Sequence, residues 1–173
     1  MGPSVRTGSP STPKATYGGT LAVTYKGLNL AIDIGGVYGN QIYRTWGALE
    51  SPYQRVNYAA FELNRWHGEG TSNSEPLLSQ ADRSNYVGST RSIENGSYFR
   101  IRNIQLGYNF SPNLISRAGI KNLRLFANVQ NLKTWKHNSG YTPEEGGSAI
   151  QFGYDFAGGA IPVVTTFGLN VTF

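Results

Sequence analysis

Cysteine is absent from this chain of 173 residues, and methionine occurs only once. The lack of cysteine excludes a disulfide framework and a zinc site built on thiolates. Charged residues make up 14% of the sequence, well below the roughly 25% of an ordinary soluble domain. No apolar run approaches the roughly 20 residues that a transmembrane helix requires. The 15 lysines and arginines are scattered without a basic run, which argues against a nucleic-acid partner despite the net positive charge.

Instead of charged residues, the chain is rich in glycine, tyrosine and small polar residues. The chain holds 22 Gly and 11 Tyr, and its mean hydropathy is −0.35. This composition suits a β-sheet with one apolar face and one wet, polar face. Residues 1–13 are mostly Gly, Pro, Ser and Thr, and they lack the apolar stretch of a signal peptide. Such a sheet also suits an outer-membrane protein, which must be exported, so we expect the chain to be a fragment whose export signal lay upstream.

The clearest local pattern is a β-hairpin over residues 17–38. Apolar and small or polar residues alternate on both sides of Lys26-Gly27, a two-residue turn signal. A turn at these two residues pairs Tyr25 with Leu28 and places apolar residues opposite each other along the whole hairpin. A shift of one residue would destroy both faces, so the register is well specified.

Two long segments, 39–96 and 133–160, separate the remaining strands. In the first segment, Ser51 and Pro52 mark a helix start that Gln54 completes as a capping box, and the helix is expected to end at His67-Gly68. The rest of both segments reads as irregular loop. Loops of this length are uncommon in compact soluble domains, but they are normal on the extracellular side of an outer-membrane barrel.

Three further strands are expected at about 98–110, 123–132 and 163–173. In the first of them Phe99 and Ile101 have the opposite parity to Ile104 and Leu106. Either a bulge lies near Arg102-Asn103, or the top of the strand stands above the bilayer. A turn at 111–122 with one helical turn at 113–117 precedes the next strand. The last strand has 11 residues, at the upper end of the roughly 9–11 that cross a bilayer.

Short turns and long loops alternate consistently between the two ends of these strands, as they do in outer-membrane barrels. The sequence therefore predicts an all-β fold: an antiparallel transmembrane β-barrel segment of about five final strands. In isolation it would be an open sheet with long extracellular loops and one short loop helix. Residues 1–15 form an N-terminal loop and residues 16–173 the strands. The residues expected to face lipid are Leu21, Val23, Leu30, Ile32, Leu106, Leu125, Phe167, Leu169 and Val171.

Four separated segments also resemble a known family, in the order in which the family has them. They are GSPSTPKATYGGTLAVTYKGLNLAIDIGGVYGNQIY, ENGSYFRIRNIQLGYNF, LRLFANVQNL and TTFGLNVTF. Together they are similar to the C-terminal portion of the SusC/RagA class of TonB-dependent transporters, outer-membrane importers of Bacteroidetes-type bacteria. The resemblance covers nearly the whole chain.

The resemblance implies that these strands complete a larger barrel whose lumen is plugged. It implies uptake of glycans or peptides, driven through the TonB complex, with a SusD-like lipoprotein lid as partner. Lipid of the outer membrane and the barrel-assembly machinery would be further partners. Phe173, a terminal aromatic residue, would serve as the C-terminal assembly signal. The alternative, which needs no family resemblance, is that Phe173 is only an aromatic residue at the membrane interface.

Aromatic residues of the long loops are the candidate ligand-binding groups, because sugar rings stack on aromatic faces. The alternative is that they pack the loops or sit at the membrane interface. No spacing of His67, Glu69 or His137 suits a metal, and we expect no cofactor, metal site or catalytic residue. The candidates are Trp46, Tyr53, Trp66, Trp135 and Tyr141.

A second function class stays open at this point: a soluble β-sandwich that binds carbohydrate. Its strands would also alternate, but its apolar faces would meet in a core, and its loops would be shorter. An enzyme is disfavoured because no set of catalytic residues converges. Glu144-Glu145 is a pair of adjacent carboxylates without a fixed partner, unlike the opposed pair of a glycosidase.

Overall fold

The computed structural model describes residues 11–46, 60–78, 90–144 and 153–173. The chain divides into two compact units. One unit contains residues 13–39, 97–136 and 160–173, and the other contains residues 1–12, 40–96 and 137–159. No helix among the described residues is both long enough and apolar enough to cross a membrane.

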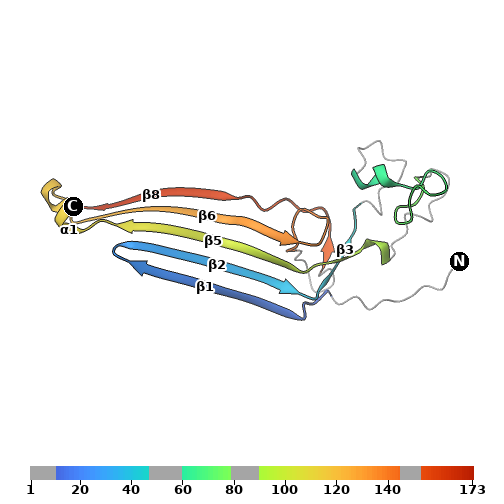
Figure 1. The fold of residues 1–173 in the computed structure, drawn as a ribbon, viewed down its shortest axis with the longest axis horizontal. Coiled ribbons are helices and arrows are strands. Elements are labelled where there is room, and N and C mark those ends of the chain that lie inside the picture. The colour runs from blue at the N-terminus through green and yellow to red at the C-terminus, as the bar shows by residue number, and fades with distance from the viewer. Residues whose placement is uncertain (1–10, 47–59, 79–89, 145–152) are drawn as a thin grey trace. The chain divides into compact units, whose positions relative to one another are not determined.

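The first unit is a five-stranded antiparallel sheet, with its strands side by side in a single layer (Figure 1). The order of these five strands across the sheet is their order along the chain, and among the described residues the sheet is open at β1 and at β8. This confirms the predicted open antiparallel sheet of five strands. In order across the sheet, the strands are β1 (Ala15–Tyr25), β2 (Leu28–Tyr38), β5 (Tyr98–Asn109), β6 (Asn122–Lys136) and β8 (Val164–Thr172).

The hairpin of β1 and β2 has the register that the sequence predicts. Tyr25 pairs with Leu28, and every later pair follows from it. Both turn residues have left-handed backbone angles, with φ of 45° at Lys26 and 86° at Gly27. Two consecutive residues with positive φ form the turn whose twist matches that of the paired strands.

A β-bulge interrupts β5 at Arg102. The strand pairs with β2 and β6 in one register up to Ile101 and in another from Asn103 onward. On β6, Asn131 lies opposite the bulge and has a φ of 54°, a conformation that asparagine tolerates better than most residues. The extra residue places Ile101 on the same face as Ile104. Of the two explanations left open by the sequence, the bulge is therefore correct.

Several strand boundaries differ from the prediction. β6 continues to Lys136, so Trp135 lies in this strand and not in the loop that was expected to begin at residue 133. β8 has 9 residues and ends at Thr172, one residue before Phe173. The turn between β5 and β6 contains α1 (Pro112–Ile115) and a 3-10 turn, η4 (Ser116–Ala118), where one helical turn was expected.

The second unit contains a small sheet that the sequence did not predict. β3 (Gln41–Arg44) pairs antiparallel with β4 (Ile93–Asn95) and parallel with β7 (Tyr154–Asp155). Short 3-10 turns also occur, at η1 (Ala60–Asn64) and η3 (Thr90–Ser92). The start of the predicted helix, at Ser51, lies outside the described residues.

Candidate functional site

The two faces of the five-stranded sheet have opposite chemistry. On one face, cross-strand rows of apolar residues run over all five strands; one such row joins Val23, Leu30, Leu106, Ala127 and Phe167. Many of these side chains are exposed, among them Leu21 at 60% and Phe167 at 79%. Within the described part of the chain, this apolar face is thus left open.

Aromatic residues border the aliphatic rows at both strand ends. Tyr25 and Tyr108 lie in the row nearest the short turns, and the Tyr108 and Phe110 rings meet edge to face with centroids 5.0 Å apart. At the other end, the rings of the paired residues Phe99 and Trp135 lie 5.5 Å apart. An apolar band between two aromatic rows is the pattern typical of the lipid-facing surface of a transmembrane β-barrel.

The opposite face of the sheet is lined by amides and hydroxyls. The Thr20 hydroxyl donates to one oxygen of the Asp33 carboxylate at 2.6 Å, and the Asn103 amide donates to the other at 3.3 Å. These three residues come from three adjacent strands. Their hydrogen bonds join the strands across a face that suits contact with water or polar solutes. We call this surface the polar face.

Glycines on the polar face make room for larger neighbouring side chains. The Phe126 ring occupies the space where a Cβ of its pairing partner Gly168 would lie. A Cβ at Gly107 would come within 3.2 Å of the Arg124 guanidinium. These side chains lie flat on the sheet because the neighbouring strand carries no side chain at that point.

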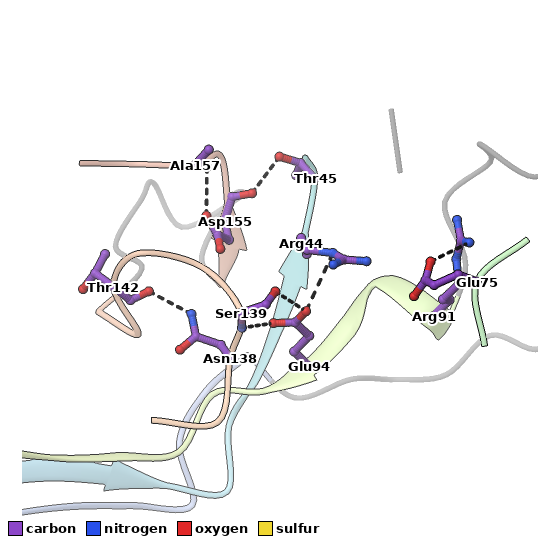
Figure 2. A network of polar contacts seen from close by, with 10 residues as sticks. All are labelled: Arg44, Thr45, Glu75, Arg91, Glu94, Asn138, Ser139, Thr142, Asp155 and Ala157. Carbon is purple, nitrogen blue, oxygen red and sulfur yellow. Dashed lines mark hydrogen bonds and ion pairs between the residues drawn. The ribbon is translucent and has the colours of Figure 1, made fainter. Parts of the chain in front are cut away.

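In the second unit, Glu94 links two segments that are far apart in the sequence (Figure 2). Its carboxylate accepts hydrogen bonds from the backbone N–H and the hydroxyl of Ser139, at 2.7 and 2.6 Å. The Arg44 Nε lies 3.7 Å from the same carboxylate. Glu94 thereby ties β3 and β4 to the segment that follows β6.

Asp155 makes a second link between the same segments (Figure 2). Its backbone carbonyl accepts from the N–H of Thr45 at 3.0 Å and from the Thr45 hydroxyl at 2.7 Å. Its side-chain carboxylate accepts from the N–H of Ala157 at 2.8 Å. Asp155 is fully buried, so its bonds hold the chain in a fixed path around β7.

We expect Glu94→Gln to loosen the segment around Ser139 without unfolding the protein. The glutamine amide keeps one acceptor oxygen, but its NH2 group faces one of the two Ser139 donors, so one hydrogen bond is lost. The remaining hydrogen bond is weaker because its acceptor no longer carries a charge. Because the site is partly exposed, the loss should be about 1 kcal/mol. Hydrogen exchange at the Ser139 amide should accelerate by about five-fold. Glu69→Gln, at an exposed position, is the control, and equal acceleration in both variants would contradict the link.

The predicted aromatic candidates are dispersed. The Arg44 guanidinium lies over the Trp46 ring, with its Cζ 5.1 Å from the ring centroid. Trp66 and Tyr141 are exposed, at 40% and 70%, while Tyr53 lies outside the described residues. Trp135 is in β6, beside Phe99. The ligand-binding role of these residues remains a prediction.

The structure brings together three other aromatic residues. The rings of Tyr43 and Tyr154 lie 5.4 Å apart, and those of Tyr154 and Phe156 are stacked at 6.0 Å. Tyr154 and Phe156 are both at least 40% exposed. Their contact with Tyr43 depends on the pairing of β3 with β7, which no local pattern reveals.

The described residues include no group of three or more His, Cys, Asp and Glu side chains that could hold a metal ion. The His67 ring nitrogen Nδ1 lies 3.0 Å from the carbonyl oxygen of Arg65, which gives it a local role in its own loop. The surfaces that the described residues expose are the polar face and the aromatic side chains of the second unit.

Curated proteins of the bacterium Formosa agariphila are similar to this chain. TonB-dependent receptor P3 is 30% identical over 171 residues, or 94% of the chain. TonB-dependent receptor P39 is 29% identical over 143 residues, and TonB-dependent receptor P26 is 26% identical over 175 residues. The chain spans 14%, 16% and 17% of the lengths of P39, P3 and P26. No family model matches the chain.

Solved structures give a consistent result. The RagAB peptide importer in its closed-closed state superposes with a TM-score of 0.77 over 97% of this chain and 18% of its own, at 23% identity. The open-open state gives a TM-score of 0.68 over 94% of this chain, at 24% identity. At these identities the likeness establishes the fold: five adjacent strands of a barrel wall together with their long connections.

Proposed function

We propose that the chain is a segment of a TonB-dependent transporter of the SusC/RagA type and forms part of the wall of an outer-membrane nutrient importer. The whole protein takes up oligomeric nutrients, glycans or peptides, with energy supplied through TonB. This segment contributes five strands and two long connections. Its apolar face contacts lipid and its polar face lines the lumen.

The division of the sheet into two faces is the observation that carries this proposal. Aliphatic rows between aromatic borders match the lipid-facing surface of a barrel, while rows of Thr, Asn and Gln match a wet interior. The lipid-facing role of Leu21, Val23, Leu30, Ile32, Leu106, Leu125, Phe167, Leu169 and Val171 belongs to this proposal. It is supported by their common face in the register of the sheet.

The partners follow from the same proposal. A SusD-like lipoprotein lid covers the extracellular mouth, to which the long connections belong. The TonB complex acts through parts of the protein outside this chain. The barrel-assembly machinery reads the final strand with Phe173, whose ring is 76% exposed and whose carbonyl oxygen accepts a hydrogen bond from Lys121 Nζ at 3.0 Å.

A soluble carbohydrate-binding sandwich is the weaker candidate. Its apolar face would be covered by a second sheet, whereas Leu21 and Leu169 are 60% and 58% exposed. An enzymatic activity is also not favoured, because the similar proteins are receptors and transporters.

The import function can be tested with the full-length protein in its host. Cells that express it should accumulate labelled oligosaccharides or peptides of one class, and removing TonB or collapsing the proton gradient should abolish this accumulation. Deletion of the gene should remove growth on that nutrient. Uptake that persists at the same rate without TonB, from a fully assembled protein, would contradict the proposal.

A further inference from the structure

The β-bulge turns Arg102 onto the polar face, where Gly35 makes room for it. A Cβ at Gly35 would lie 2.8 Å from the Nε of Arg102 and 3.2 Å from its Cζ. Gly35 itself is buried, whereas Arg102 is exposed. The arginine side chain therefore lies across a glycine of the neighbouring strand, and its position depends on the missing side chain there.

Arg100 lies directly beside this position. It is the pairing partner of Gly35 and is only 3% exposed. Its Nε donates to the Thr134 hydroxyl at 2.7 Å, and its guanidinium lies 5.6 Å from the Tyr98 ring. Arg100 is thus held by these contacts and adds a second positive charge to the same face of β5.

The charges of the surrounding strands reinforce this pair. On the polar face, the five strands carry four basic residues and a single acidic one, Asp33; the basic residues are Arg100, Arg102, Arg124 and Lys136. Both oxygens of the Asp33 carboxylate already accept hydrogen bonds, from Thr20 and Asn103. Because the basic residues outnumber this one carboxylate, the polar face carries a net positive charge that should attract anions.

We propose that Arg102, supported by Arg100, binds a carboxylate of the transported solute on the polar face. The planar guanidinium matches a carboxylate with two parallel hydrogen bonds, which lysine cannot reproduce. The solute is then a carboxylate-bearing oligomer, either an acidic peptide or an oligosaccharide of uronic acids. This inference rests on the proposed import function, since it requires the polar face to meet the solute.

Three substitutions in the full-length transporter separate the effects of the charge of Arg102, the geometry of its guanidinium group and the position of its side chain. Arg102→Gln removes the charge, and Arg102→Lys retains it without the planar fork. Gly35→Ala leaves the arginine intact but displaces it with a methyl group. Gly19→Ala is the matched control, because a Cβ at Gly19 has no neighbour within 4 Å.

Binding is measured by calorimetry on the purified transporter with two matched pairs of probes. One pair is tetraglutamate and tetraglutamine, and the other is trigalacturonate and its methyl ester. The wild type should prefer the acidic member of at least one pair by about ten-fold or more. Arg102→Gln should abolish that preference, Arg102→Lys and Gly35→Ala should reduce it, and Gly19→Ala should retain it. The pair that shows the preference identifies the source of the carboxylate.

Other outcomes would overturn the site. No preference in the wild type, or a preference that survives Arg102→Gln, would mean that this arginine does not bind solute carboxylates. Binding of neither member of either pair would contradict it as well. TonB-dependent uptake without an acidic preference would leave the import function standing. An acidic preference without any energy-dependent uptake would support the site and contradict the import function.

Discussion

Ile104→Arg should destabilise the full-length protein by about 2–4 kcal/mol, because it places a charge at the middle of the apolar band that we propose to face lipid. On β5, Ile104 is the central outward position between the aromatic residues Phe99 and Tyr108. An arginine there can reach neither membrane interface without distorting the strand. The measurement is the urea midpoint of the protein refolded in lipid vesicles, together with the amount of folded barrel in cells.

The matched control for Ile104 is its neighbour Gln105. Its side chain points to the opposite face, so Gln105→Arg should change the stability by less than about 0.5 kcal/mol. Equal losses in the two variants would mean that the two faces do not meet different environments. Loss only at Gln105 would reverse the assignment of lipid and lumen.

Gly36→Ala should be the most harmful of the small substitutions in the sheet, with a loss of about 2–3 kcal/mol. A Cβ at this position would press against the carbonyl oxygen of Tyr98 in the adjacent strand and against the Tyr17 hydroxyl. That hydroxyl donates to the same carbonyl at 3.0 Å. The methyl group must therefore displace either the Tyr17 ring or the backbone ladder between β2 and β5.

Gly19→Ala is again the suitable control, since it adds the same methyl group to the adjacent strand where nothing lies within 4 Å. Its urea midpoint should stay within the error of the wild type or rise slightly, because alanine restricts the unfolded chain. If Gly36→Ala were equally neutral, the close packing of Tyr17 over β2 would be wrong.

The parts of the fold that the sequence predicted correctly are determined by residues that lie close together in the sequence. Lys26-Gly27 determines the register of β1 and β2 because a two-residue turn leaves one pairing that keeps both faces uniform. The alternation of apolar with small or polar residues likewise predicted β8, whose observed bounds are one residue shorter at each end than expected.

The bulge at Arg102 illustrates where local patterns become insufficient. The reversed parity of Ile101 was visible, but its cause lay in two pairings, one with β2 and one with β6. The end of β6 was missed for a related reason. Lys133 on the apolar face and the left-handed Asn131 interrupt the alternation, so Trp135 looked like a loop residue.

The second unit could not have been predicted from local patterns. β3, β4 and β7 have four, three and two residues, which is too short for a period to be detected. Their partners are distant in the sequence; Thr45 and Asp155, which hold two of these segments together, are 110 positions apart. The candidate aromatic residues were chosen for exposure in loops, whereas the stacked Tyr154 and Phe156 are brought to Tyr43 by strand pairing alone.

The two-residue turn at Lys26-Gly27 also has a consequence for the order of folding. Hairpins of this kind close within about 1–10 microseconds. Pairing of β2 with β5 must instead close the stretch from Gly39 to Ser97, at an additional entropic cost of about 3 kcal/mol. The β1–β2 hairpin should therefore form first, and β5 should add to its existing edge. Shortening that stretch would accelerate folding, while lengthening the tight turn would remove the template on which the remaining strands assemble.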